Sequence, residues 1–169
     1  MKIAITGHKR GIGKAFADQL GSLGHQIIGI SRSDGENIRR TVHTASIIEP
    51  CDMWINNAIS FYAQTELLFE VWHRWQPSQQ KRKIWNISTK AVLSESQLID
   101  GLTMRQSMQY WNQKMSLELA HNQLSSLHSN IEMLLIRPGA VNTQAFSHPD
   151  SILPDQFVNE ILLEQGMIG

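Results

Sequence analysis

The sequence predicts one α/β domain, spanning residues 1–169, built on a doubly wound parallel sheet. Short apolar runs typical of buried strands alternate with longer segments whose apolar residues recur at helical spacing. No internal repeat or low-complexity segment interrupts this alternation. Such alternation favours a parallel sheet covered by helices on both faces. A chain of 169 residues is long enough for one such domain with a real core, and short for two.

The first half of the chain supplies three strand–helix units. Residues 2–5 are an apolar run, residues 12–23 have helical spacing, and Gly24 follows as a natural helix end. A turn is expected at 33–37, and Pro50 closes a short helix, because the residue before a proline avoids helical geometry. The same reasoning predicts strands at 26–31 and 51–58 and helices at 38–49 and 63–75.

The second half continues the pattern. A polar, basic loop leads to a fourth strand at 84–88, and a fifth strand at 131–136 is stopped by Pro138 and Gly139. A short helix is expected at 154–163. Between the last two strands lies a long helix, 103–127, and one of its faces carries Met104, Met108, Trp111 and Met115.

Composition excludes several classes of function. Lysine and arginine number 15, as do aspartate and glutamate, so no global charge attracts nucleic acid or an anionic membrane. The single cysteine, Cys51, excludes an internal disulfide and argues against a cysteine-based metal site. The N-terminus has no signal-peptide pattern and no apolar run is long enough to span a bilayer. We therefore expect a cytoplasmic protein with neither nucleic acid nor membrane as a partner.

The stretch "TGHKRGIG" lies between the first predicted strand and the first predicted helix. In that context Gly7 permits a tight exit from the strand and Gly11 lets the backbone approach a pyrophosphate. Gly13 lets the helix pack closely on the sheet. The free N–H groups of the first helical turn then face an anion. The stretch predicts a dinucleotide-binding site of the Rossmann type.

Two other interpretations of this stretch were weighed. A P-loop requires Lys-Ser or Lys-Thr after its last glycine, whereas Lys14 is followed by Ala15 and lies at another spacing. A glycine-rich turn without a ligand is the remaining alternative, and the strand–turn–helix context argues against it.

Cations near this turn bear on which dinucleotide binds. A ribose 2′-phosphate needs positive charge near the end of the second strand, whereas a free 2′-hydroxyl prefers a carboxylate there. Arg32 lies at that point and Arg10 lies in the turn beside it. Guanidinium groups suit phosphate because their donors form a planar fork. We therefore expect NADP(H) to be preferred, with NAD(H) possible because Asp34 follows closely.

Five motifs occur in the following order along the chain, each at the end of the expected element: "TGHKRGIG", "NNA", "NIST", "YWNQK" and "RPGAVNT". With these motifs the chain resembles the short-chain dehydrogenase/reductase family, from Lys2 to about Thr143. The resemblance implies a Rossmann-type fold and hydride transfer between a nicotinamide cofactor and a small carbonyl or alcohol.

Tyr110 and Lys114 are the candidate acid–base pair. A spacing of four puts both side chains on one face of a helix, one turn apart. A free phenol, with a pKa of about 10, is a poor base near neutrality, and a neighbouring ammonium lowers that value. Tyr110 can then exchange a proton with the substrate oxygen. The resemblance implies that Lys114 also binds the nicotinamide ribose and that a hydroxyl from Thr89, or else from Ser88, steadies that oxygen.

The glycine turn, the cations and the resemblance together predict a set of cofactor contacts. The Pro-Gly segment is implied to hold the nicotinamide carboxamide, "NNA" to border the adenine-side ribose, and residues 37–38 to lie near adenine. The predicted contacts are Gly7, Lys9, Arg10, Gly11, Ile12, Gly13, Ser31, Arg32, Ser33, Asn37, Ile38, Asn57, Ala58, Ile59, Tyr110, Lys114, Pro138, Gly139, Val141 and Thr143.

The chain departs from the family pattern in several places. So few residues separate the second strand from Asn37 that a helix and a strand are expected to be missing. Ile59 replaces the glycine that usually follows "NNA", and Gln64 is only a weak substitute for the family's catalytic asparagine. An extra loop is expected within 90–108. Little chain remains after Thr143 to form a substrate lid and a last strand, so the cleft should be open or closed by a neighbouring subunit.

Other conspicuous residues are given ordinary roles. The seven histidines, His148 among them, show no metal-ligand spacing, so no metal is predicted. Leu68, Trp72 and Trp75 form a helical stripe, for which core packing is favoured over an oligomer seam. The basic stretch "QKRK" is expected to be a solvated turn.

The sequence therefore predicts a minimal NADP(H)-dependent oxidoreductase that interconverts a small carbonyl compound and its alcohol, assembled as a homo-oligomer, either a dimer or a tetramer. The alternative is a catalytically silent dinucleotide-binding sensor or regulatory protein, which the missing asparagine and the short tail favour. A nucleotide-sugar epimerase or dehydratase is a third interpretation, but such enzymes have a large C-terminal substrate domain and this chain has no room for one.

Overall fold

A computed structural model describes residues 1–93, 98–99, 101–143 and 151–169. Five parallel strands form one sheet in the order β2-β1-β3-β4-β5. Their bounds are Lys2–Thr6 for β1, Gln26–Ile30 for β2, Met53–Asn56 for β3, Arg82–Ile87 for β4 and Ile131–Ile136 for β5. The order reverses direction at β1, as in a doubly wound sheet, so the predicted fold class is confirmed.

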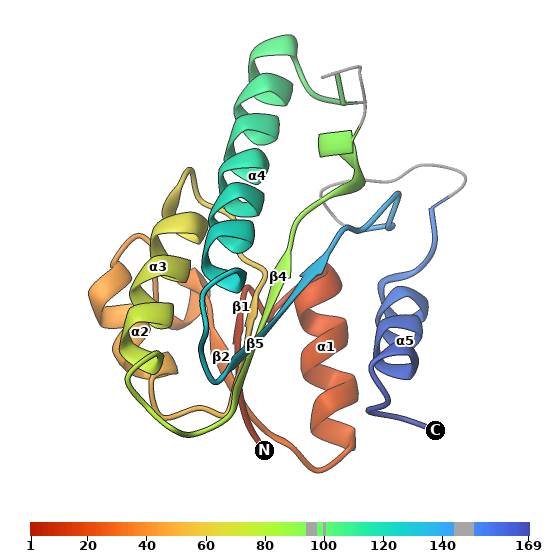
Figure 1. The fold of residues 1–169 in the computed structure, drawn as a ribbon. Helices are drawn as coiled ribbons and strands as arrows, with labels where there is room; N and C mark the ends of the chain where they lie inside the picture. The colour runs from red at the N-terminus through yellow and green to blue at the C-terminus, as the bar shows by residue number, and fades with distance from the viewer. Residues whose placement is uncertain (94–97, 100, 144–150) are drawn as a thin grey trace.

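Helices cover both faces of the sheet (Figure 1). On one face lie α1 (Gly11–Ser22) and α5 (Pro154–Glu164), which contact each other. The other face is covered by α2 (Thr41–Ile48), α3 (Ala63–Trp75) and α4 (Met104–Ser125). Short 3₁₀ turns follow β2 and β4, at η1 (Arg32–Asp34) and η2 (Lys90–Leu93).

Strand residues alternate between two cores, as the period of a strand requires. Ile3 and Ile5 of β1 pack beneath α1 and α5, and Ala4 between them packs beneath α2 and α3. On the α2–α3–α4 face, Leu68, Trp72 and Trp75 are at most 6% exposed. The core-packing interpretation of this stripe is therefore confirmed, and the alternative of an oligomer seam there is wrong.

Most predicted helices and strands are confirmed within two residues. The helix predicted to begin at residue 38 begins later, at Thr41. Residues before it form a turn, in which the carbonyl of Asn37 accepts hydrogen bonds from the Arg40 N–H (2.8 Å) and the Thr44 hydroxyl (3.1 Å). The long helix runs from Met104 to Ser125. Thr103 caps its start through a capping box, and Ser126 is the C-cap residue at its end.

Both edges of the sheet are open within the described residues. No strand pairs with the outer side of β2, which agrees with the expected loss of a helix and a strand after it. No strand follows α5 beside β5 either. The extra loop expected within 90–108, and the segment after Thr143, lie partly outside the described residues.

All five strands run in the same direction, so their carboxyl ends meet at one edge of the sheet. In α/β sheets ligands bind outside these ends, at the point where the strand order reverses. The two chain termini lie at the opposite end of the molecule (Figure 1). No helix of the described segments is long and apolar enough to cross a membrane.

Candidate active site

The turn between β1 and α1 has a backbone conformation that favours glycine. Gly7 and Gly11 have φ angles of +75° and +52°, in the left-handed region. A Cβ atom at Gly13 would lie 2.3 Å from the carbonyl oxygen of Gly7, so any side chain there would force α1 away from the turn. The first turn of α1 has no side-chain cap and no acidic residue. Its free N–H groups are therefore available to an anion.

Thr6 ties the loop after β3 to this turn. Its hydroxyl oxygen accepts hydrogen bonds from the backbone N–H groups of Asn57 (3.0 Å) and Ala58 (3.1 Å), and donates to the carbonyl of Ile55 (3.3 Å). The side-chain amide of Asn57 donates to the carbonyl oxygens of Thr6 (3.0 Å) and Gly7 (3.4 Å). The side chain of Asn57 thus holds the backbone of the glycine turn through these hydrogen bonds.

Thr143 brings the last predicted motif to the glycine turn. A Cβ atom at Gly11 would lie 3.1 Å from the Thr143 methyl carbon, so the two residues are in contact range. Val141 is buried, at 4% exposure. The strand-like pairing beside it, in which the N–H of Asn142 donates to the carbonyl of Ile152 (2.8 Å), holds this segment in place.

The Pro-Gly segment lies next to η2. The N–H of Lys90 donates to the carbonyl of Pro138 (2.8 Å). The three atoms nearest to a Cβ atom at Gly139 all belong to the Lys90 side chain, with Cδ at 3.4 Å. Gly139 itself is exposed.

The end of β2 carries a small polar cluster. The carboxylate of Asp34 accepts from Lys9 (3.0 Å) and lies 3.4 Å from the His8 ring. The hydrogen bond from Lys9 lowers the pKa of Asp34. The Ser31 hydroxyl lies 2.7 Å from that of Ser33 and donates to Asp34 (3.1 Å). Asp34 is thus engaged by the Lys9 ammonium of the glycine turn.

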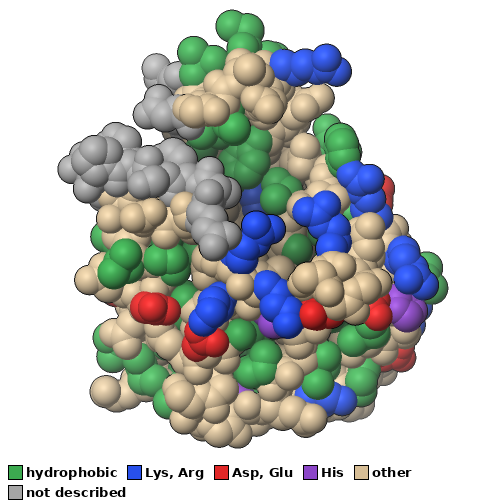
Figure 2. Space-filling view, turned by 180° about the vertical axis from the view of Figure 1, so that it is seen from behind, with side chains coloured by type: hydrophobic (Ala, Val, Ile, Leu, Met, Phe, Trp, Pro, Cys, Tyr) green, Lys and Arg blue, Asp and Glu red, His purple; other side chains and the backbone are tan. Residues whose placement is uncertain are grey.

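The remaining predicted contacts on this side differ in exposure. Arg10 and Arg32 are exposed, and neither makes an ion pair within the described part of the chain. Ile12 and Ala58 are half-buried against the two cores, while Ile59 is 40% exposed. Figure 2 shows basic side chains gathered across the middle of this side, below a hollow with apolar side chains.

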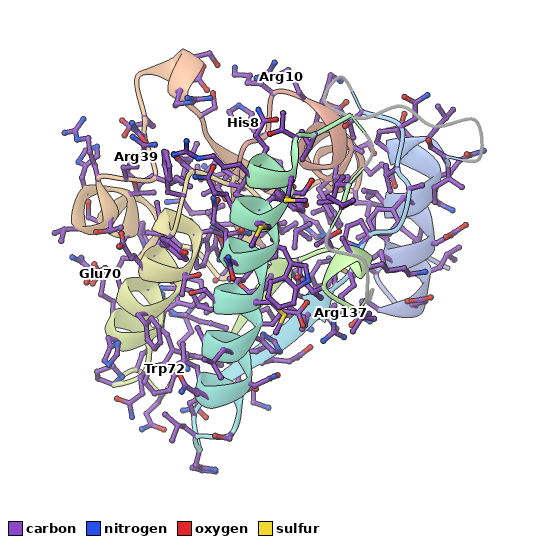
Figure 3. The ribbon with its side chains drawn as sticks, turned by 90° about the horizontal axis from the view of Figure 1, so that it is seen from above. His8, Arg10, Arg39, Glu70, Trp72 and Arg137 are labelled. Carbon is purple, nitrogen blue, oxygen red and sulfur yellow. The ribbon has the colours of Figure 1, made fainter. Side chains whose placement is uncertain are left out.

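The predicted adenine contacts are only partly open. Ile38 is 5% exposed and belongs to the core, so its side chain is not free for a ligand. Asn37 accepts from the backbone N–H of Arg39 (3.1 Å). Arg39 in turn donates to the Ser60 hydroxyl (2.8 Å) and lies 4.4 Å over the ring of Phe61. Arg39, labelled in Figure 3, joins the start of α2 to the loop after "NNA".

Tyr110 and Lys114 share a face of α4, as predicted, with the Lys114 ammonium 5.9 Å from the centre of the Tyr110 ring. Lys114 is 3% exposed, and its ammonium donates to the Gln64 amide oxygen (3.0 Å) and the Ile87 carbonyl (2.7 Å). Burial lowers the pKa of Lys114 to about 7. The Gln64 amide nitrogen donates to the carbonyls of Asn56 (2.7 Å) and Ile87 (3.2 Å), which fixes its orientation.

The two candidate hydroxyls have different partners. Ser88 is 3% exposed and donates to the Glu118 carboxylate (2.5 Å). The Thr89 side chain lies beside Tyr110. Burial raises the pKa of Tyr110, and the interaction with Thr89 opposes the rise. Only Thr89 therefore brings a hydroxyl to the phenol.

Several residues of the site were not among the sequence predictions. Thr6 and Arg39 connect loops, while Glu118 and Arg137 form an ion pair (2.7 Å) between α4 and the end of β5. Glu118 lies one turn beyond Lys114, which is the one sequence signal that could have marked it. Figure 3 shows Arg137 on the α4 side of the site, across from His8 and Arg10.

No group of three histidine, cysteine, aspartate or glutamate side chains in the described ranges could hold a metal ion. His148 lies outside the described residues.

Comparison with solved structures identifies proteins with a similar fold. A 4-hydroxyisoleucine dehydrogenase complexed with NADH has a TM-score of 0.72 at 20% identity, with 100% of this chain and 93% of that chain covered. A short-chain dehydrogenase from Sphingobium yanoikuyae in complex with NADPH has a TM-score of 0.72 at 16% identity (98% and 84% covered). The 3-alpha-hydroxysteroid dehydrogenase from Pseudomonas sp. B-0831, complexed with NADH, has 0.67 at 16% (96% and 89%).

No protein-family model and no curated protein sequence matches the chain. The similarity to solved structures therefore defines the fold: the protein has the fold of the short-chain dehydrogenases/reductases.

Proposed function

We propose that residues 1–169 act as one domain and form an NADP(H)-dependent oxidoreductase that interconverts a small carbonyl compound and its alcohol. The observation that carries this proposal is the meeting of Tyr110, Thr89 and Lys114 at the carboxyl edge of the sheet. A phenol held beside a hydroxyl and an ammonium can exchange a proton with a substrate oxygen. The similar solved structures include dehydrogenases complexed with NADH or NADPH.

The residues at the glycine turn fit a dinucleotide. A side chain at Gly13 would collide with the turn, and α1 presents uncapped N–H groups that suit a pyrophosphate. In this assignment Thr143 and Gly139 would hold the nicotinamide end and Gly11 the pyrophosphate, and Thr143 lies within contact range of Gly11. When bound, the nicotinamide supplies or accepts the hydride.

The protein's part is proton transfer and orientation. Tyr110 donates a proton to the carbonyl oxygen in reduction and removes it from the alcohol in oxidation. Thr89 donates its hydroxyl to the same oxygen. The effect of burial on the pKa of Tyr110 is opposed by its interaction with Thr89. A positive charge on Lys114 favours the phenolate form of Tyr110. Because the pKa of Lys114 is about 7, this assistance is strongest in the protein at neutral or lower pH.

The preference for NADP(H) rests on the cations near β2. Arg32 and Arg10 are exposed and free of ion pairs in the described structure, so both can turn to a 2′-phosphate. Asp34 is held by Lys9 and is a less available acceptor for a ribose hydroxyl. Binding of NAD(H) is expected to be weaker.

The second candidate function is a dinucleotide-binding sensor without turnover. The open edge of β5 in the described sheet favours it, because hydride transfer benefits from a site that excludes water. The interaction of Thr89 with Tyr110 argues for the enzyme.

Two measurements separate these functions. NADPH fluorescence reports binding, and its decay with a panel of aldehydes and ketones reports turnover. We expect Tyr110→Phe to bind NADPH and to lose turnover by at least ~100-fold, the usual scale of general acid catalysis. Tyr62 is the other tyrosine and is 48% exposed, so Tyr62→Phe is the matched control. NADPH binding without turnover on any substrate would favour the sensor.

The predicted homo-oligomer is assigned to one surface. The apolar face of α4 consists of Met104, Met108, Trp111, Met115 and Leu119. Of these, Met104 is 65% and Leu119 60% exposed. Arg105 is the one exposed charged residue of α4, since Lys114 and Glu118 are buried. An apolar, charge-poor surface rich in methionine is typical of interface cores, and a second copy matches its lack of charge.

The cytoplasmic location stays a prediction from the sequence.

A further inference from the structure

The end of β4 is attached to α4 by three consecutive residues and three successive turns of the helix. The contacts pair Ile87 with Lys114 (2.7 Å), Ser88 with Glu118 (2.5 Å) and Thr89 with Tyr110. Each contact uses the next polar residue along one face of α4, at a spacing of four. The contact between Ser88 and Glu118 involves neither of the predicted acid–base residues. Ser88 nevertheless lies between Ile87 and Thr89 on the strand, and Glu118 lies one turn beyond Lys114 on the helix.

Glu118 is a buried carboxylate with two hydrogen-bond partners, Arg137 and Ser88, among the residues that the structure describes. It is 7% exposed. Arg137 donates to both of its oxygens, from Nε to Oε1 (2.9 Å) and from Nη2 to Oε2 (2.7 Å). Ser88 shares Oε1. A bidentate guanidinium fixes both the position and the charge of a carboxylate.

This ion pair is not explained by fold stability alone. A buried ion pair is often no more stabilising than a well-packed apolar pair of the same volume. The strand end already has a backbone anchor, because the Ser88 N–H donates to the Ile136 carbonyl (2.7 Å). The pair is therefore better understood through its effect on neighbours.

The neighbour most affected is Lys114. Its direct partners are neutral, the Gln64 amide from α3 and the Ile87 carbonyl from β4. Burial lowers its pKa, and the charge of Glu118 is what raises it again. The other titratable groups nearby are Tyr110 and His121 on α4, both partly desolvated, and Arg137 at the end of β5, which is held by Glu118.

We propose that Glu118, anchored by Arg137, is a positioning residue of the site. It holds Ser88, so that the next residue, Thr89, faces Tyr110, and its negative charge favours the binding of a proton by the buried Lys114. The consequence for catalysis rests on the proposed function. The effect on Lys114 does not, because it belongs to the free protein.

Proton binding by Lys114 is the direct test. The protein is labelled with ¹³C,¹⁵N-lysine, the Lys114 side-chain signal is assigned with Lys114→Met, and its shift is followed against pH. Glu118→Gln keeps an acceptor for Ser88 but removes the charge. We expect it to weaken proton binding at Lys114 at least tenfold. Arg137→Gln removes the positive charge that offsets the charge of Glu118. Proton binding at Lys114 is therefore expected to become stronger in this variant.

The control is Glu132→Gln, which removes a carboxylate from an exposed ion pair with Lys83 on the same sheet. It should leave Lys114 unchanged. Arg137 is 35% exposed, so the Arg137→Gln variant tests the proposal even if Glu118→Gln does not fold. An unchanged Lys114 titration in the folded variants would overturn it.

Turnover provides a second, separable result. With an active substrate, Glu118→Gln should move the alkaline limb of the kcat profile to lower pH. A purely structural role would lower activity at every pH without that movement. If no substrate is turned over but the Lys114 titration shifts as expected, the proposed enzyme fails and the positioning role of Glu118 is retained.

Discussion

Single residues fix the two most constrained points of the site, Gly13 and Lys114. Gly13 is constrained by space, because its missing Cβ leaves room for the Gly7 carbonyl. Lys114 is constrained by solvation, because its ammonium is buried with neutral hydrogen-bond partners. Both constraints lead to measurable effects that do not depend on knowing the substrate.

Substitution of Gly13 tests the close contact between α1 and the glycine turn. Gly13→Ala should lower the free energy of unfolding by about 1–3 kcal/mol, as overpacking does, and abolish NADPH binding. Gly21 lies in the same helix with its nearest atom 3.7 Å from a Cβ position. Gly21→Ala should therefore raise the free energy of unfolding by about 0.5–1 kcal/mol, since alanine favours helix. Urea unfolding and NADPH fluorescence measure both; equal effects of the two substitutions would disprove the contact.

The buried Lys114 predicts a pH dependence of stability. Its pKa is about 7 in the folded protein and 10.5, the ordinary value for lysine, when the chain is unfolded. Between these values the unfolded chain binds more protons, so the free energy of unfolding rises with pH and the gain is complete only above 10.5. From pH 7 to 9 we expect about 2 kcal/mol from this group. Urea unfolding of Lys114→Met should show a smaller increase. The same increase in both proteins would contradict the assigned burial.

At the scale of elements, α4 differs most from its neighbours. It has 22 residues and α3 has 13, so α4 is longer by about 13 Å at 1.5 Å per residue. In Figure 1 its first turns rise beyond the other helices. One face of α4 carries the polar residues of the site, and another is the apolar face assigned to a second copy.

A charge on the apolar face of α4 should dissociate the oligomer. Met108 and Met115 are 44% and 37% exposed, so lysine at either position is tolerated in a monomer. We expect sedimentation of Met108→Lys and Met115→Lys to give monomers at concentrations where the original protein is a dimer. Gln123→Lys, an exposed polar position on the same helix, is the control. A monomeric original protein, or dimers of all three variants, would refute the assigned surface.

The elements were more predictable than the contacts between them. Apolar runs and helical spacing located every strand and α-helix, because both are local consequences of backbone geometry. The choice between Ser88 and Thr89 was not local, because both side chains reach α4. Only the packing of the strand end against the helix shows that Thr89 meets Tyr110 and Ser88 meets Glu118. The pairing of Glu118 with Arg137 joins a helix to a neighbouring strand end, and no sequence pattern marks such a pair.

Considered as a whole, the molecule concentrates its ligand chemistry at one end of the sheet. The protein has no net charge, yet basic side chains gather on the side seen in Figure 2. A dinucleotide bound there connects the loops after β1, β2, β4 and β5, and so should stabilise the whole fold by mass action.

Thermal unfolding measures that stabilisation. At a concentration about 100 times its Kd, NADPH should add about 2.7 kcal/mol to the free energy of unfolding. This corresponds to a rise in Tm of several degrees for a chain of this size. NADH at the same concentration should give a smaller rise. Arg32→Asp should reduce the NADPH shift far more than the NADH shift; equal losses would defeat the assignment of Arg32 to the 2′-phosphate.

Both termini emerge at the end of the molecule opposite the glycine turn (Figure 1). A tag, a fused reporter or a tether to a sensor chip can therefore be attached at either terminus without obstructing the ligand-binding side. Immobilised protein should bind NADPH as it does when free in solution.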